Sequence, residues 1–304
     1  MKFSNLKKIF CGHNRGGLIA VMIAIFVCMI SQQNKAEEFA GIEITEKGKG
    51  AAIIFIPGLN SAEDTFTETC AALASNHKCY LLQLPGFAGQ EPMNLQQGFL
   101  NPVKENIIAL MKKKKLSKVT LVGHSLGGLI SLMITLDSPE LIDKIVIIDS
   151  LPFFPAIQNP SLTAELAKPQ AEQMRVQMNA PSDEDYIKNA AFSVQGMSNQ
   201  SSRQPLLIQW SKTSDRATTT QAMYELMTTD LRASIAAIQK PVMVLGAWAA
   251  YKPYGSTMES TKAIYTTQYA QLKNVDIRMS ETGFHFLTWD DTEWVNQQIK
   301  EFLN

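Results

Sequence analysis

The chain has 304 residues, of which 45% are hydrophobic and 18% are charged, and its formal net charge is zero. These proportions exclude a disordered or fibrous protein and allow a sizeable core, either in one large α/β domain or in a domain with an insertion. Five of the 28 Lys and Arg, but none of the 28 Asp and Glu, precede residue 37, so the remainder carries 23 bases against 28 acids. That acidic balance argues against nucleic acid as a partner.

Residues 1–36 have the pattern of an export signal. Cations precede the apolar run 18–30, which fits a signal peptide and is short for a membrane-spanning helix. We therefore expect cleavage near residue 36 and a periplasmic or secreted protein. The alternative is an uncleaved segment that anchors the protein in the inner membrane.

Two cysteines, Cys70 and Cys79, remain once this segment is removed. An oxidising compartment permits a disulfide between them, and spacing alone does not decide between a bridge and two buried thiols.

Strands and helices alternate through the first half of the chain. The predicted strands, identified by short β-branched or apolar runs, are residues 41–45, 51–56, 79–84, 119–122 and 144–149. The predicted helices are residues 65–75, 101–115 and a segment that begins at residue 126. The last of these strands is continuously apolar, which is typical of a strand buried on both faces of a parallel sheet.

The pattern becomes polar and helical over residues 152–240, which indicates an inserted helical cap. Strands at 241–246 and 275–280 and helices at 257–270 and 292–303 then complete the alternation. The sequence therefore predicts an α/β fold with a mostly parallel central sheet and helices on both of its faces. Its core comprises residues 37–151 and 241–304.

The candidate site is organised around Ser125. An apolar strand runs into Gly123-His124-Ser125-Leu126-Gly127 and then into a helix. Glycines allow so sharp a corner, and the corner exposes the serine hydroxyl above the N-terminus of the helix. Helical N–H groups at that position favour negative charge, so the turn is suited to a nucleophile and an oxyanion.

A serine hydroxyl needs a base to take its proton, and the chain has four histidines. His13 belongs to the predicted signal, and His77 lies near the start of a strand, at the wrong edge of the sheet. His124 neighbours Ser125 and is expected to point the other way. His285 lies in the loop after the last strand, and this loop is at the same edge of the sheet as Ser125. We therefore predict that His285 is the base.

The carboxylate that orients the histidine is less well defined by the sequence. The loop after strand 241–246 is one customary place for it, and residues 247–252 contain no acid. We predict Asp149, which ends the strand after the serine strand and preserves the order Ser, Asp, His. Asp230 is the first alternative and Glu281 is the second. Asp290 is expected to be structural, in a capping box for the final helix.

The predicted oxyanion donors are two backbone N–H groups, those of Leu126 and Leu59. Leu59 follows Gly58 in the loop after strand 51–56, and Gly58 allows close approach of the backbone. Asn60 is either a third donor or a turn-forming residue.

The elbow around Ser125, the Pro57-Gly58 loop and Phe284-His285-Phe286 together resemble the α/β-hydrolase superfamily, in particular compact bacterial members with a helical cap, over residues 42–304. The chain departs from the usual pattern at Pro57, where a histidine is common, and at the missing acid after the penultimate strand. The resemblance implies a serine hydrolase that cleaves an ester or a related acyl bond in a small molecule. It implies no metal and no organic cofactor. The alternatives are a C–C bond or amide hydrolase and, because the acid is missing, a hydrolase-like binding protein with weak turnover.

Overall fold

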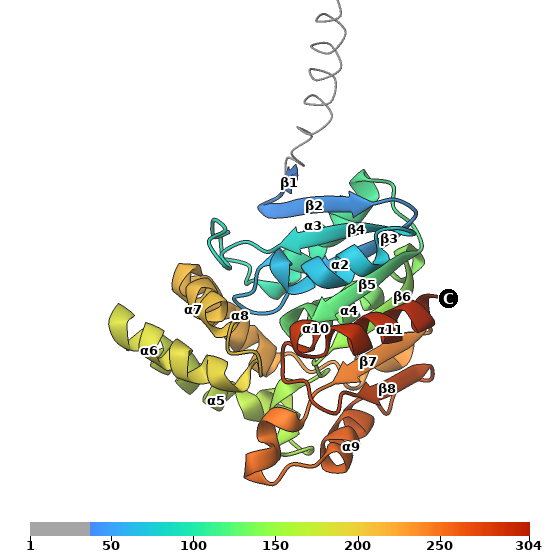
Figure 1. The fold of residues 1–304 in the computed structure, drawn as a ribbon. Helices are drawn as coiled ribbons and strands as arrows, with labels where there is room; N and C mark the ends of the chain where they lie inside the picture. The colour runs from blue at the N-terminus through green and yellow to red at the C-terminus, as the bar shows by residue number, and fades with distance from the viewer. Residues whose placement is uncertain (1–36) are drawn as a thin grey trace, which may run out of the picture. The chain divides into compact units, whose positions relative to one another are not determined.

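The structure is a computed structural model and describes residues 37–304 (Figure 1). The predicted export signal, residues 1–36, lies outside the described residues. In residues 37–304, eight strands form a single sheet in the order β1-β2-β4-β3-β5-β6-β7-β8. Within residues 37–304, no helix combines the length and the apolar character that crossing a bilayer requires.

The sheet is mostly parallel. Its strands are β1 Glu37–Phe39, β2 Ile42–Gly48, β3 Ala51–Ile56, β4 His77–Gln83, β5 Val119–His124, β6 Ile142–Ile148, β7 Val242–Gly246 and β8 Val275–Met279. Strand β2 pairs antiparallel with β1 and β4, and all other pairs are parallel. The predicted fold class is confirmed. The sequence did not predict β1, a three-residue edge strand.

Helices cover both faces of the sheet. One face carries α2 Thr67–Leu73, α10 Leu287–Asp290 and α11 Thr292–Leu303, and the other carries α3 Leu100–Lys113, α4 Leu126–Asp137 and α9 Met258–Gln268 (Figure 1). Strand β3 shows why two layers form, because successive side chains of a strand point to opposite faces. Ile53 and Phe55 pack with α2 and α11, whereas Ile54 and Ile56 pack with α3 and α4.

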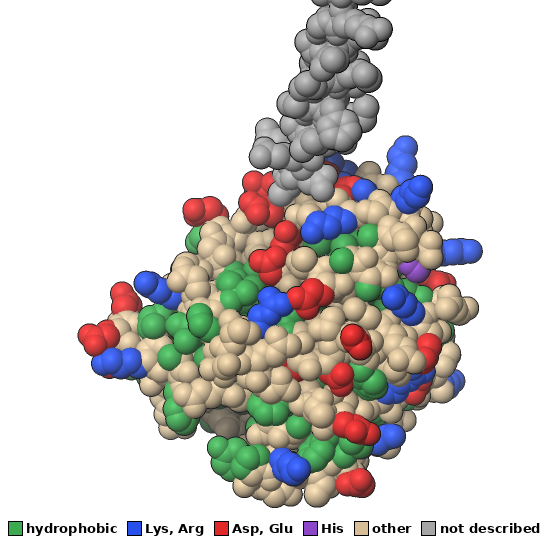
Figure 2. Space-filling view, in the orientation of Figure 1, with side chains coloured by type: hydrophobic (Ala, Val, Ile, Leu, Met, Phe, Trp, Pro, Cys, Tyr) green, Lys and Arg blue, Asp and Glu red, His purple; other side chains and the backbone are tan. Residues whose placement is uncertain are grey.

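Four further helices lie between β6 and β7, and we call them the inserted helices: α5 Ala164–Asn179, α6 Asp183–Ser193, α7 Gln204–Thr213 and α8 Arg216–Thr228. They fall within residues 152–240, for which the sequence predicts an inserted helical cap. The remaining helical segments are 3-10 turns at Glu63–Phe66, Pro139–Leu141, Phe154–Ile157, Val194–Gly196, Ser234–Ala237 and Ala249–Tyr254. Apolar side chains gather on the surface of the inserted helices in the view of Figure 2. Leu166, Val176 and Phe192 are large apolar residues of these helices that are exposed.

Arg232, which forms an ion pair with Asp230, joins the two ends of this insertion. The Arg232 guanidinium also donates hydrogen bonds to the carbonyl oxygens of Pro160 and Leu162 and lies over the ring of Phe153. The two ends of the insertion are thereby joined, so Asp230 has a structural partner.

The inserted helices contact loops at the carboxyl edge of the sheet. The Thr219 hydroxyl of α8 donates to Asn60, in the loop after β3, at 2.6 Å. The N–H of Phe286, in the loop after β8, donates to the carbonyl oxygen of Met197 at 2.9 Å. Both of these loops contain predicted site residues.

Cys70 of α2 and Cys79 of β4 are fully buried and are not bridged in the structure. Of the two arrangements that the sequence left open, the structure has the two buried thiols.

Candidate active site

Ser125 lies at the corner between β5 and α4, with backbone angles φ 52° and ψ −121°. A non-glycine residue in such a sparsely populated region costs about 1–3 kcal/mol and persists only where the surroundings hold it. A Cβ at Gly123 would lie 2.2 Å from the carbonyl oxygen of Gly127, and one at Gly127 would lie 2.0 Å from that of Ile56. The two glycines are therefore required for β5, α4 and β3 to approach one another at the serine.

The loop after β3 passes directly beside this corner. A Cβ at Gly58 would lie 3.0 Å from the Cβ of Ser125, so Leu59, the next residue, is close to the serine. Leu126 is the first residue of α4, and the first N–H groups of a helix have no acceptor within that helix. The two residues predicted to supply the oxyanion donors thus lie next to Ser125 in the chain and in the loop beside it.

Asn60 forms the turn of this loop. Its φ of 56° is left-handed, which asparagine tolerates better than most residues, and its Oδ1 accepts the hydrogen bond from Thr219. Asn60 therefore shapes the loop and connects it to α8.

The structure brings His285 and Asp149 together, with His285 Nδ1 2.6 Å from Asp149 Oδ2. Asp149 follows β6 and Ser125 follows β5, and the preceding residues, Ile148 and His124, are paired in the sheet. Ser125 and Asp149 therefore follow the ends of two neighbouring strands at equivalent positions along the sheet. Asp230, the alternative acid, pairs instead with Arg232.

Three donors surround the Asp149 carboxylate, whose side chain is 14% exposed. His285 meets Oδ2, while Oδ1 accepts from the N–H of Ala247 at 2.9 Å and from the hydroxyl of Tyr265 at 2.5 Å. Burial alone would raise the pKa of Asp149, but the hydrogen bond and charge of His285, together with the other two donors, hold it below its usual value. The carboxylate is therefore ionised at neutral pH. It accepts the Nδ1 proton of His285 and leaves Nε2 free to act as a base.

His124 does more than the sequence suggested. We expected its side chain to point away from the site, yet its Nε2 lies 3.0 Å from the carbonyl oxygen of His285 and the two rings are 4.6 Å apart. Burial, with the nearby His285 as the second cause, lowers the pKa of His124 to about 3. The imidazole is therefore neutral, and its Nε2–H donates to the His285 backbone.

The predicted capping box at Asp290 is wrong. Helix α11 begins at Thr292 with Asp291 at its N-cap, and that cap makes no side-chain hydrogen bond. Asp290 instead accepts from the N–H groups of Phe284 and Asn199 and from the Ser198 hydroxyl. The loop turns back on itself through α10, so Asp290 ties the His285 loop to the inserted segment.

Tyr265 was missed by sequence reasoning because it lies in α9, 116 residues from Asp149. Its only signal in the sequence is Tyr269, four positions later, which places two tyrosines on one helical face.

The hydroxyl of Ser125 makes no hydrogen bond within residues 37–304. A hydrogen bond between a nucleophile and its base is often long in a protein without substrate and shortens only in the reactive complex.

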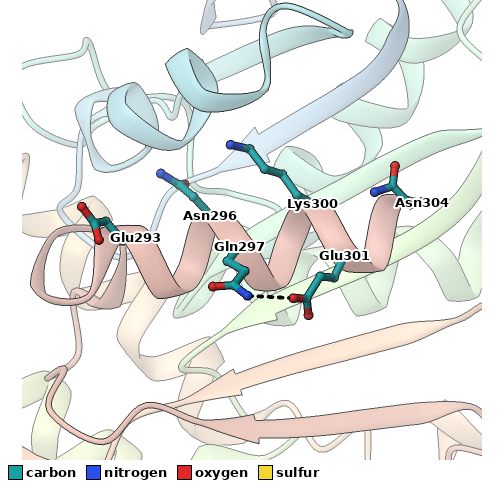
Figure 3. Close-up of a pocket in the computed structure, with 6 residues that line it drawn as sticks. All are labelled: Glu293, Asn296, Gln297, Lys300, Glu301 and Asn304. Atoms are coloured by element: carbon teal, nitrogen blue, oxygen red, sulfur yellow. Dashed lines mark hydrogen bonds between the residues drawn. The ribbon is translucent and has the colours of Figure 1, made fainter.

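A hollow of about 440 Å³ lies elsewhere, along the outer face of α11 (Figure 3). Its lining residues are all polar or charged and belong to that helix and its C-cap: Glu293, Asn296, Gln297, Lys300, Glu301 and Asn304. None of the candidate site residues lines it, so it is a feature separate from the site at Ser125. In the described part of the chain, no three His, Cys, Asp or Glu side chains are grouped so as to hold a metal ion.

Comparison with known proteins yields a family match. The model of the alpha/beta hydrolase fold family matches residues 51–247, a range that includes Ser125 and Asp149 and ends before His285. An esterase from Exiguobacterium antarcticum has a similar structure, with a TM-score of 0.72 at 14% identity over 88% of this chain and 99% of that protein.

Curated relatives match shorter stretches. A pimeloyl-[acyl-carrier protein] methyl ester esterase from Aeromonas hydrophila is 27% identical over 116 residues, which is 38% of this chain and 44% of the relative. A dihydrolipoyllysine-residue acetyltransferase component of an acetoin cleaving system from Pseudomonas putida is 27% identical over 129 residues, or 42% of this chain and 35% of the relative. The chain thus spans less than half the length of these curated relatives.

Proposed function

The chain belongs to the α/β-hydrolase fold family, and on this basis we propose that it is a serine hydrolase that cleaves an ester or a related acyl bond through an acyl-enzyme on Ser125. One observation carries the proposal. The bond of 2.6 Å between His285 Nδ1 and Asp149 Oδ2 completes a base and acid pair at the carboxyl edge that also bears the strained serine.

The proposed chemistry has two stages. Nε2 of His285 takes the proton of the Ser125 hydroxyl as Oγ bonds to the acyl carbon, and the carbonyl oxygen acquires negative charge near the N–H groups of Leu59 and Leu126. The imidazolium then gives its proton to the departing alcohol. Water, deprotonated by the same nitrogen, next attacks the acyl carbon. The bond from that carbon to Oγ breaks, the imidazolium returns its proton to Oγ, and the acid is released.

Asp149 supports the charged histidine in both stages, because it stays ionised beside the imidazolium. Its contact with His285 supports the enzyme over a binding protein with weak turnover, an alternative motivated by the absence of an acid after β7. The names of two relatives, an ester esterase and an acetyltransferase component, favour acyl chemistry as well.

The proposal is tested with a panel of p-nitrophenyl esters of graded acyl chain length, together with matched anilides. We expect the wild-type protein to hydrolyse at least one ester faster than the corresponding anilide, and Ser125→Ala to lower kcat by at least about a thousandfold. Faster cleavage of the anilides would favour the amide hydrolase. Equal turnover by the wild-type protein and Ser125→Ala would refute the acyl-enzyme.

We also propose that the protein is exported. The support is the sequence of residues 1–36, with cations before the apolar run 18–30. N-terminal sequencing of the protein recovered from the periplasm and the medium tests this, since export with cleavage predicts a new N-terminus near residue 37. An uncut N-terminus in the membrane fraction would instead support the anchor.

A further inference from the structure

Helix α9 and its C-cap residue, Tyr269, bind the segment that begins at Asp149 through three side chains on one face. The Tyr265 hydroxyl donates to Asp149 Oδ1 at 2.5 Å, the Tyr269 hydroxyl donates to the carbonyl oxygen of Ser150 at 2.9 Å, and Gln268 Oε1 accepts from the N–H of Phe153 at 3.2 Å. All three side chains are at least 95% buried. Of the three, only Tyr265 contacts a residue of the proposed reaction.

The Asp149 backbone is one that needs such support. Its φ of 45° is left-handed, and its N–H is held by the carbonyl oxygen of Leu245 at 2.7 Å. Because a carboxylate can turn about its Cβ–Cγ bond, a single contact with His285 does not fix which oxygen faces the imidazole. The N–H of Ala247 and the hydroxyl of Tyr265 both meet Oδ1, so the plane is set and Oδ2 is left for His285.

The charge state of the tyrosine is compatible with a donor. Burial and the nearby charge of Asp149 raise the pKa of Tyr265 well above its usual value, so the phenol keeps its proton throughout the neutral range. A neutral hydroxyl against a buried carboxylate is a charge-assisted hydrogen bond, which is stronger than a bond between neutral groups.

We propose that Tyr265 is a positioning residue of the reaction, whose hydroxyl fixes the Asp149 carboxylate so that Oδ2 holds His285 in its catalytic orientation. The inference rests on the proposed function, since it concerns the same site. It also explains how an acid in the loop after β6 is held beside a histidine in the loop after β8. Helix α9 connects β7 to β8, and its Tyr265 reaches Asp149 at the end of β6.

Tyr265→Phe removes only the hydroxyl, and Tyr269→Phe is its matched control, a buried tyrosine four residues later at the C-cap of the same helix. We expect Tyr265→Phe to lower kcat/KM for the preferred ester about tenfold, mainly through kcat, and Tyr269→Phe to change it less than about twofold. Equal losses in both variants, in proportion to their thermal stabilities, would mean that the helix face serves only packing.

A double-mutant cycle tests whether Tyr265 acts through Asp149. In an Asp149→Ala background the carboxylate is absent, so Tyr265→Phe should have little further effect on kcat/KM. A full tenfold loss in that background would overturn the inference.

A measurement that does not depend on turnover separates this inference from the proposed function. The proton shared between His285 Nδ1 and Asp149 gives a downfield imidazole resonance in the NMR spectrum. Loss of one donor makes the carboxylate a stronger acceptor for the others, so Tyr265→Phe should move this resonance further downfield, and Tyr269→Phe should leave it in place. Incorporation of 3-fluorotyrosine at position 265 keeps the hydroxyl and makes it a stronger donor, so it should move the resonance the opposite way.

An unchanged resonance in both the phenylalanine and the fluorotyrosine proteins would overturn the inference. A wild-type protein that hydrolyses no ester, yet shows these shifts, would contradict the proposed function and leave the positioning role of Tyr265 supported.

Discussion

His124 holds the main chain of His285. Its Nε2 lies 3.0 Å from the His285 carbonyl oxygen, and its ring packs against the His285 ring at 4.6 Å. The residue just before the proposed nucleophile thus fixes the segment that carries the proposed base. Because His124 is 1% exposed, this contact depends on a neutral imidazole in the interior.

His124 should make the stability of the protein depend on pH. The pKa of an unfolded histidine is about 6.5, and burial lowers that of folded His124 to about 3. Since the folded value is the lower one, the stabilisation is fully present above pH 6.5 and is lost as pH falls toward 3. Between pH 7 and pH 5 the wild-type protein should lose about 2 kcal/mol from this group.

His124→Gln keeps an N–H donor near Nε2 and does not titrate. Urea unfolding of both proteins at pH 7 and pH 5 should therefore show a smaller loss in the variant, by about the same 2 kcal/mol. Parallel pH dependences of the free energy of unfolding would show that His124 titrates normally in the folded protein.

The two candidate acids should respond differently to the same substitution. Asp149→Asn removes the charge that supports His285 and alters its tautomer, so kcat should fall by roughly ten thousandfold. Asp230→Asn weakens the ion pair with Arg232 at the base of the insertion, and we expect less than about a tenfold change in kcat. Steady-state kinetics of both variants decides, and loss of activity in Asp230→Asn alone would assign the acid to Asp230.

Gly127 should tolerate no side chain. A Cβ there would lie 2.0 Å from the backbone oxygen of Ile56, whereas one at Gly196 would meet nothing within 4 Å. Gly127→Ala should cost on the order of 3 kcal/mol or prevent folding, and Gly196→Ala should change stability by less than about 0.5 kcal/mol. Thermal unfolding measures both, and a wild-type melting temperature for Gly127→Ala would contradict the close packing of β3 against α4.

Glu225 should stabilise the contact between α8 and the core. Its two carboxylate oxygens accept the N–H groups of Phe99 and Leu100, each at 2.7 Å, at the start of α3. A carboxylate at a helix N-terminus satisfies free donors and complements the helix dipole. Glu225→Ala should therefore lower the free energy of unfolding by about 1–2 kcal/mol.

Glu172→Ala is the matched control, since Glu172 forms an exposed pair with Arg175 within α5. It should change the free energy of unfolding by less than about 0.5 kcal/mol. Equal effects of the two substitutions would show that the α3 cap contributes nothing beyond a surface charge.

The fold was predictable because its signals are local. Consecutive apolar residues mark the run 144–149 and the strand and helix on either side of Ser125 as buried elements. These elements are enough to predict a parallel sheet and the edge at which its strands end. Strand β1 was missed because three residues at an edge contain too little periodicity to be recognised.

The site was less predictable than the fold because it depends on contacts between segments that are distant in the sequence. Asp149, at the end of a strand, was a candidate from its position alone, but nothing near Tyr265 in the sequence indicates that its hydroxyl reaches that carboxylate. Asp290 misled for a related reason. Its spacing to Glu293 fits a local cap, whereas its oxygens are taken by the N–H groups of Phe284 and Asn199 once the loop has folded.

The central claim is that Ser125 is an activated nucleophile, and covalent labelling with a fluorophosphonate tests it most directly. After incubation, intact-mass spectrometry followed by peptide mapping should show one phosphonyl adduct, located on Ser125. The adduct should be absent from Ser125→Ala and should form much more slowly in His285→Ala. Folded wild-type protein that acquires no adduct, or acquires it at another residue, would contradict the account.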